Sequence, residues 1–178
     1  MADNRYMSQN IQLKPQDVLV ALKLHIERAN PRPRLVDIAA DLGLSQAEVS
    51  GSLKRSIFAG LSRPGDGIPY PEALKEFVLH GLRYAFPAQL GAIAKGMPTS
   101  HSAAPLNKKI SSAEHFVWPD AKGEVRGSSV EPLYPSVPFA ASRDFKLYEL
   151  FALIDALRVG QSRERKLAMK ELEKRLSA

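Results

Sequence analysis

The sequence contains no cysteine. Disulfides and thiolate metal sites are therefore excluded, and nothing in the composition argues for secretion. No apolar run approaches the roughly 20 residues of a membrane-spanning helix. The polar stretch at residues 1–14 also lacks the apolar core of a signal peptide. We therefore expect a cytoplasmic protein that makes no contact with a membrane.

The motifs of common enzymes are also absent. The sequence has no Walker loop, no GxGxxG, no GxSxG, and no pair of carboxylates set apart in an apolar frame. Its four histidines, His25, His80, His101 and His115, do not show the HxH or HxxxH spacing of metal ligands. We expect no catalytic activity, no metal and no cofactor. His25 and His80 are interpreted as satisfied helix-surface residues. Residues 99–102 are interpreted as a mobile loop, with a polar binding loop as the alternative.

Positive charge is in modest excess. The formal net charge is +6, the pI is about 9.6, and 44% of the residues are apolar. This balance favours a polyanionic partner weakly, and no block of the chain is a basic tail. Any contact with nucleic acid would therefore come from a patch that the fold assembles.

The first half of the chain reads as three short helices. Pro15 can open a helix, and apolar residues at helical spacing continue it to about Arg28, where the prolines of residues 30–33 end it. A second helix follows from about residue 35. Gly43 can adopt positive φ and end this helix. These boundaries are set by local chemistry.

A capping box predicts the start of the third helix. Ser45 stands three residues before Glu48, so the two side chains can satisfy each other's backbone N–H groups. Val49, Leu53 and Ile57 then form its buried face, and Gly60 ends it.

The remaining elements are read more coarsely. Residues 61–71 form a proline-bearing link about the size of a small wing. Residues 72–86 form a helix whose apolar side carries Leu74, Phe77, Val78, Gly81, Leu82 and Ala85. We expect a long loop at 87–113, a short hairpin at about 115–127, and an extended crossover to about 139. Two helices complete the chain, at about 144–159 and 162–176.

The stretch IAADLGLSQAEVSGSLKR, residues 38–55, resembles helix-turn-helix transcriptional regulators of the winged, MarR-like type. The resemblance covers roughly residues 13–80. It implies that the helix at 46–59 enters the major groove of double-stranded DNA. By position, the implied base-facing or groove-facing residues are Ser45, Gln46, Ala47, Ser50 and Gly51, and the implied phosphate contacts are Lys54 and Arg55, with Arg63 on the wing. Arg32 and Arg34 are further candidates for the backbone, unless they belong to a solvated loop.

The last third of the chain leaves alternatives open. The apolar stripe from Leu147 to Leu157 can form a dimer interface or pack within the chain on the 72–86 helix. Trp118 can be a ligand wall, an interface anchor or, by default, a core residue. The hairpin tip at 120–123 and Arg126 could instead reach DNA as a displaced wing.

These observations predict a mainly α fold, with an N-terminal winged helix-turn-helix domain and a helical C-terminal region carrying a small β-hairpin. The predicted divisions are 13–86 for DNA binding, 87–143 as loop and hairpin connector, and 144–178 for dimerisation or partner contact. The expected function is sequence-specific DNA binding by a homodimeric transcriptional repressor. The alternative is an interaction adaptor, such as the antitoxin-like partner of another protein. A small-molecule effector is compatible with both.

Overall fold

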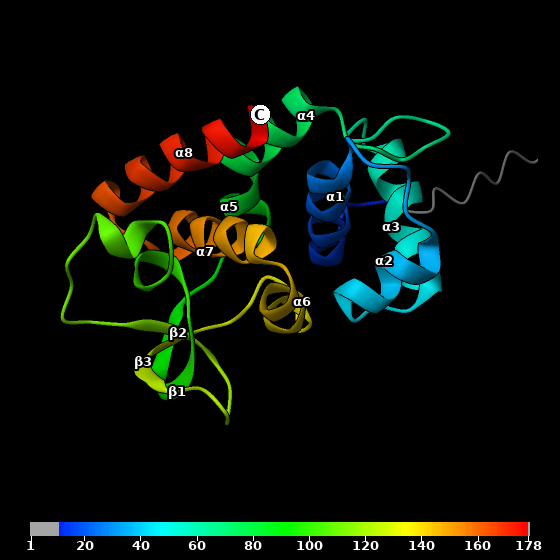
Figure 1. The fold of residues 1–178 in the computed structure, drawn as a ribbon. Coiled ribbons are helices and arrows are strands. Elements are labelled where there is room, and N and C mark those ends of the chain that lie inside the picture. Colours follow the sequence, from blue (N-terminus) through cyan, green and yellow to red (C-terminus); the bar gives the residue numbers. More distant parts are fainter. Residues whose placement is uncertain (1–10, 178) are drawn as a thin grey trace, which may run out of the picture.

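The computed structural model of the protein describes residues 11–177 and is mainly helical with one small sheet (Figure 1). The helices are α1 (Pro15–Glu27), α2 (Leu35–Leu42), α3 (Gln46–Phe58), α4 (Pro71–Glu76), α5 (Leu82–Ala85), α6 (Val137–Arg143), α7 (Phe145–Val159) and α8 (Ser162–Ser177). The strands are β1 (Leu90–Pro98), β2 (Phe116–Pro119) and β3 (Val125–Val130). The predicted mainly α class is confirmed at this coarse level. None of the helices in the described range is long and apolar enough to cross a bilayer.

The first three helices pack together, and we call them the tri-helical unit (α1–α3). Helix α1 begins at Pro15, as predicted, and contacts both α2 and α3. Its burial differs from the predicted amphipathic stripe, because every residue from Asp17 to His25 is buried. Helix α7 also contacts α1, so the side that faces away from the tri-helical unit is covered too.

The predicted helix at 72–86 exists but is not regular. Helix α4 passes into a π-helical turn, η1 (Phe77–Gly81), and then into α5. Leu74, Val78 and Leu82 are buried as predicted, whereas Ala85 is exposed. Helix α4 lies beside α8 at the top of Figure 1.

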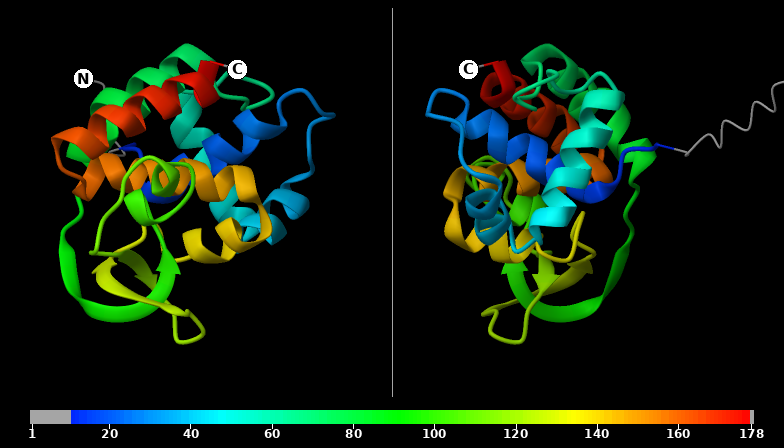
Figure 2. Two further views of the ribbon diagram at one scale, coloured as in Figure 1. Left: turned by 60° about the vertical axis from the view of Figure 1, so that its left-hand side comes forward. Right: turned by 90° about the vertical axis from the view of Figure 1, so that its right-hand side faces the viewer.

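The predicted loop at 87–113 is wrong, because β1 occupies its first part. The segment LGAIAKGMP is rich in glycine and alanine, so it lacks the β-branched pattern that predicts a strand. Two short 3₁₀ turns follow, η2 (Ser100–Ser102) and η3 (Leu106–Lys108). Figure 2 shows β1 as a long curved strand around the base of the molecule.

The predicted hairpin at about 115–127 is also wrong in its pairing. Strands β2 and β3 are both antiparallel to β1 and parallel to each other, and the three close into a small barrel. A Cβ on Gly96 would lie 1.9 Å from the carbonyl oxygen of Trp118, so only glycine permits this approach of β1 to β2.

Helix α7 runs through the middle of the fold (Figure 1). Asp144 caps it, since its Oδ1 accepts hydrogen bonds from the backbone N–H groups of Lys146 (3.0 Å) and Leu147 (3.3 Å). Helix α6 precedes it within the segment predicted to be extended, with Pro138 in its first turn, where proline is tolerated. The stripe from Leu147 to Leu157 is buried inside the chain, so it is not an exposed dimer face.

A buried carboxylate joins the barrel to α7. Asp155 Oδ2 accepts hydrogen bonds from Thr99 Oγ1 (2.8 Å) and Trp118 Nε1 (2.6 Å), and Oδ1 pairs with Arg158 Nη1 (2.8 Å). Burial raises the pKa of Asp155 above its usual value, and the Arg158 charge opposes this rise. Trp118 is therefore a core residue, which confirms the default interpretation of the sequence.

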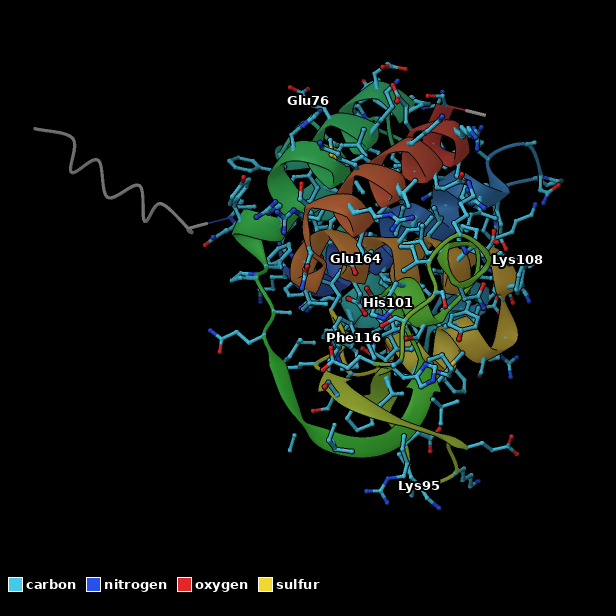
Figure 3. The ribbon with its side chains drawn as sticks, turned by 90° about the vertical axis from the view of Figure 1, so that its left-hand side faces the viewer. Glu76, Lys95, His101, Lys108, Phe116 and Glu164 are labelled. Atoms are coloured by element: carbon cyan, nitrogen blue, oxygen red, sulfur yellow. The ribbon has the colours of Figure 1, made fainter. Side chains whose placement is uncertain are left out.

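The segment 99–102 is not a mobile loop but part of this buried region. Thr99, Ser100 and His101 are all buried, and Ser102 Oγ accepts the backbone N–H of Phe116 at 2.9 Å. The His101 and Phe116 rings meet edge to face with centroids 4.5 Å apart (Figure 3).

One apolar core runs through all three predicted divisions of the chain. It includes Leu22 of α1, Leu53 of α3, Trp118 of β2 and Ile154 of α7. The predicted boundaries at residues 86 and 143 therefore do not separate independent cores.

Candidate nucleic-acid interface

The turn between α2 and α3 is built on a glycine. Gly43 has φ 64° and ψ 36°, a left-handed conformation that strains other residues, and it ends α2 as predicted. A Cβ at this position would also lie 3.0 Å from the Phe139 ring. Leu44 N–H then donates to the carbonyl of Ala39 at 2.9 Å, and this bond closes the turn.

The predicted capping box at the start of α3 is confirmed. Glu48 N–H donates to Ser45 Oγ at 3.2 Å, and Ser45 N–H donates to Glu48 Oε2 at 2.8 Å. Ser45 Oγ also donates to the same carboxylate oxygen at 2.8 Å, so the hydroxyl proposed to face DNA is already engaged by the cap. The hydrogen bond from the Ser45 backbone holds the pKa of Glu48 below its usual range.

A residue from far along the chain also contacts this cap. Tyr134 OH donates to Glu48 Oε1 at 2.9 Å, and this bond raises the pKa of the tyrosine. Tyr134 was not identified from the sequence, because no local pattern connects it to a helix 86 residues away. The contact ties the crossover before α6 to the first turn of α3.

The outward face of α3 is polar and accessible. Gln46, Ala47 and Lys54 are exposed, and Ser50 and Gly51 are half-buried. Gln46, Ser50 and Lys54 follow one another at four-residue intervals, so they lie along one side of the helix. The acidic side chain of α3, Glu48, is occupied by the cap and by Tyr134. The face therefore presents an amide, a hydroxyl and an ammonium group to solvent.

Arg55 does not belong to this exposed set, which corrects its prediction as a phosphate contact. Its Nε and Nη2 donate to both carboxylate oxygens of Asp17 at 2.8 and 2.6 Å, and Asp17 is fully buried. Arg55 Nη2 also donates to Ser52 Oγ at 3.2 Å. A Cβ on Gly51 would lie 3.1 Å from Arg55 Nη1. The glycine therefore leaves room for the ion pair between Arg55 and Asp17.

The other predicted arginines lie in loops next to the tri-helical unit. Arg34 pairs with Asp37 at 2.9 Å and Arg63 with Asp66 at 2.8 Å, and all four side chains are substantially exposed. Arg32 Nη1 donates to the carbonyl of Gly65 at 3.1 Å, which joins the loop before α2 to the loop after α3. Exposed pairs of this kind are weak. A phosphate can therefore compete for these guanidinium groups.

The loop after α3 is closed like a very short hairpin. Ser62 and Pro69 form an isolated antiparallel bridge, and Arg63 N–H donates to the carbonyl of Ile68 at 2.9 Å. Its prolines stop the pairing from extending, as the sequence indicates. The barrel, by contrast, lies on the opposite side of the molecule from α3 (Figure 1), so its tip at 120–123 and Arg126 are not a wing beside that helix.

The histidines correct one further prediction. His80 is exposed as expected, but His25 and His101 are buried. Neither ring nitrogen of His25 has a hydrogen-bond partner among residues 11–177. Within that range, no group of His, Asp and Glu side chains could hold a metal ion.

No family model, no curated protein and no solved structure matches the chain. The resemblance to MarR-like regulators therefore stays a prediction that depends on the motif at residues 38–55.

Proposed function

We propose that the protein is a transcriptional regulator that binds specific DNA sequences through a winged helix-turn-helix formed by α1–α3 and the loop at 61–70. The observation that carries this proposal is the outward face of α3, which is polar, cationic at Lys54 and directly preceded by the Gly43 turn. The major groove is wide enough to admit a helix of this kind.

In this proposal the residues divide by the type of DNA contact. Gln46 and Ser50 supply hydrogen-bonding groups that can read base edges, and Ala47 offers an apolar contact to a thymine methyl group. Lys54 meets a phosphate, and Arg32, Arg34 and Arg63 exchange their weak surface contacts for further phosphates. Arg55 contributes indirectly, because its pair with Asp17 fixes α3 against α1.

The proposal includes a homodimer acting as a repressor, since two-fold proteins match paired half-sites about one helical turn apart. The dimer interface would lie outside the Leu147–Leu157 stripe, which the chain itself covers.

Replacement of Lys54 tests the proposal. We expect Lys54→Ala to weaken binding to every DNA sequence and to reduce the slope of log affinity against log salt by about one unit, as loss of one phosphate contact does. Fluorescence anisotropy at several salt concentrations measures the slope.

Lys170→Ala is the matched control, because Lys170 is an exposed lysine on α8. An equal effect of the two replacements would contradict the assignment of α3 as the DNA-contacting helix.

An adaptor function is the second candidate, and Phe58 favours it. This ring is 68% exposed at the end of α3, on the same side as Ala47 and Lys54. Exposed aromatic residues are common anchors of protein interfaces. An adaptor would co-purify in stoichiometric amount with the product of a neighbouring gene, and Phe58→Ser would abolish the complex without changing the salt dependence of DNA binding.

A further inference from the structure

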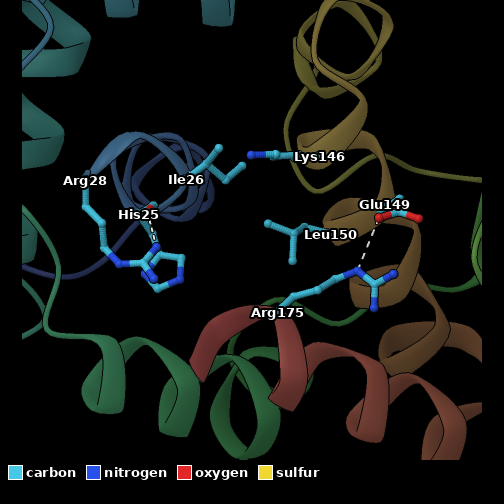
Figure 4. Close-up of a pocket in the computed structure, with 7 residues that line it drawn as sticks. All are labelled: His25, Ile26, Arg28, Lys146, Glu149, Leu150 and Arg175. Carbon is cyan, nitrogen blue, oxygen red and sulfur yellow. Dashed lines mark hydrogen bonds and ion pairs between the residues drawn. The ribbon is translucent and has the colours of Figure 1, made fainter. Parts of the chain in front are cut away.

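Helix α1 and the two C-terminal helices, α7 and α8, line a partly open pocket of about 410 Å³ (Figure 4). Its lining comes from the end of α1, the first half of α7 and the end of α8. A pocket of this size lies within the range that small molecules occupy in proteins. None of the predicted DNA contacts lines it.

His25 is the unusual member of this lining. Its side chain is buried, with the residue only 1% exposed, and neither ring nitrogen has a partner in the described part of the chain. Burial and the nearby Arg28 charge lower the pKa of His25, and the backbone carbonyl of Arg175 opposes this fall without reaching hydrogen-bonding geometry. A buried donor without a partner is unfavourable. A ligand that accepts its hydrogen bond would remove that cost.

Positive charge dominates the rest of the polar lining. Arg28, Lys146 and Arg175 line the pocket with a single carboxylate, that of Glu149. Arg175 is already held by Glu149 (3.2 Å) and by Glu171, whereas Arg28 donates one N–H to the carbonyl of His25 at 2.6 Å. Arg28 and Lys146 are therefore the cations best able to meet an incoming anion.

The apolar part of the lining is aliphatic. Ile26 and Leu150 extend into the space from α1 and α7 (Figure 4), and no lining residue has an aromatic ring apart from the His25 imidazole. A ligand would therefore gain from a flexible apolar chain rather than from ring stacking.

We infer that this pocket binds a small aliphatic monocarboxylate, with its carboxylate directed to His25, Arg28 and Lys146 and its chain packed on Ile26 and Leu150. The inference does not depend on DNA binding. The ligand would contact the end of α1 in the tri-helical unit and the first half of α7.

Titration of the full-length protein with hexanoate tests the inference. Long-range ¹H–¹⁵N spectra report the imidazole nitrogens, and a His25→Leu spectrum identifies the His25 signals. We expect a saturable change in these signals with hexanoate, binding of hexanamide at least tenfold weaker, and no change with inorganic phosphate. Absence of a His25 response, equal binding of hexanamide, or the same response to phosphate would overturn the inference.

Two variants locate the site by calorimetry. We expect His25→Leu to weaken hexanoate binding about tenfold and Lys146→Gln about three- to fivefold, the losses typical of one buried hydrogen bond and one partly exposed charge. Lys170→Gln serves as the matched control and should bind like the unmodified protein. Lys146 is exposed, so its replacement leaves the fold intact and remains informative if His25→Leu does not fold. Unchanged binding in Lys146→Gln would overturn the site.

Discussion

Helices α3 and α7 both carry apolar residues at helical spacing, yet they have opposite environments. Helix α3 has 13 residues and buries only Val49, Ser52, Leu53 and Ser56, whereas α7 has 15 residues and buries nine between Leu147 and Leu157. One stripe therefore marks a surface helix and the other belongs to a helix at the centre of the core. The stripe itself does not distinguish the two cases.

The residues outside the apolar stripe distinguish the surface helix from the core helix. In α7, Ala152, Leu153 and Ala156 lie off the stripe and are also buried, so most of the surface of the helix between Leu147 and Leu157 is covered. In α3, Gln46 and Lys54 lie outside the buried set and are exposed, and Ser50 between them is half-buried. A face available for function is identified by exposed polar residues outside the stripe. The α7 stripe is therefore the one that packs within the chain, while α3 remains the candidate for DNA.

The largest loss in the free energy of unfolding is expected from replacing Asp155 of α7. Asp155→Ala leaves the buried Arg158 charge and the Trp118 indole N–H without their partner. Loss of one member of a buried pair typically costs about 3–5 kcal/mol. Urea unfolding followed by the fluorescence of Trp118, the single tryptophan, measures the change. A loss below about 1 kcal/mol would show that α7 is not held by this carboxylate.

Replacing two neighbouring residues of α3, Arg55 and Lys54, should have very different effects on the free energy of unfolding. Arg55→Ala leaves the Asp17 carboxylate buried without its cation, and we expect a loss of about 3 kcal/mol in the free energy of unfolding. Lys54→Ala removes an exposed side chain and should change it by less than about 0.5 kcal/mol. The same urea experiment compares the two variants. Equal losses would contradict the assignment of Arg55 to the interior and Lys54 to the surface.

Acid should weaken the contact that holds α8 in place. Hydrogen bonds from Lys109 and Arg175 lower the pKa of Glu171 to about 2 in the folded protein, from an ordinary value of 4.5. The stabilisation is therefore complete above pH 4.5 and is lost as the pH falls toward 2. Because Lys109 is partly exposed, we expect roughly 2 kcal/mol.

Glu171→Gln provides the comparison that isolates this group. Its stability should fall less steeply between pH 4.5 and 2 than that of the unmodified protein, measured by chemical unfolding at each pH. Identical pH profiles would exclude Glu171 as the group responsible.

A smaller loss in the free energy of unfolding is expected from removing the N-cap of α3. Ser45→Ala removes the side chain that accepts the Glu48 N–H, and loss of such a cap typically costs about 1 kcal/mol. Ser45→Asp retains a capping oxygen and is the control. If both variants were as stable as the unmodified protein, the cap would not stabilise α3.

The tri-helical unit was largely predictable because its boundaries depend on neighbouring residues. Pro15, Gly43 and the Ser45–Glu48 box each act within a few positions, and each has the predicted role. Strand β1 was missed because its glycine-rich segment is held by pairing with β2 and β3, which lie later in the chain.

Long-range contacts also limited the prediction of the candidate site. The exposure of Gln46, Ala47 and Lys54 follows from the periodicity of α3. The inward direction of Arg55 does not, because it depends on Asp17, 38 residues earlier. The bond from Tyr134 to Glu48 spans 86 residues and has no sequence signal.

Binding to DNA from the gene's own upstream region, against excess random competitor at two salt concentrations, tests the central claim most directly. The account predicts a competitor-resistant complex that weakens as salt rises and protects paired half-sites about one helical turn apart. Weak binding that random DNA removes equally well would contradict it, because only generic positive charge would then remain.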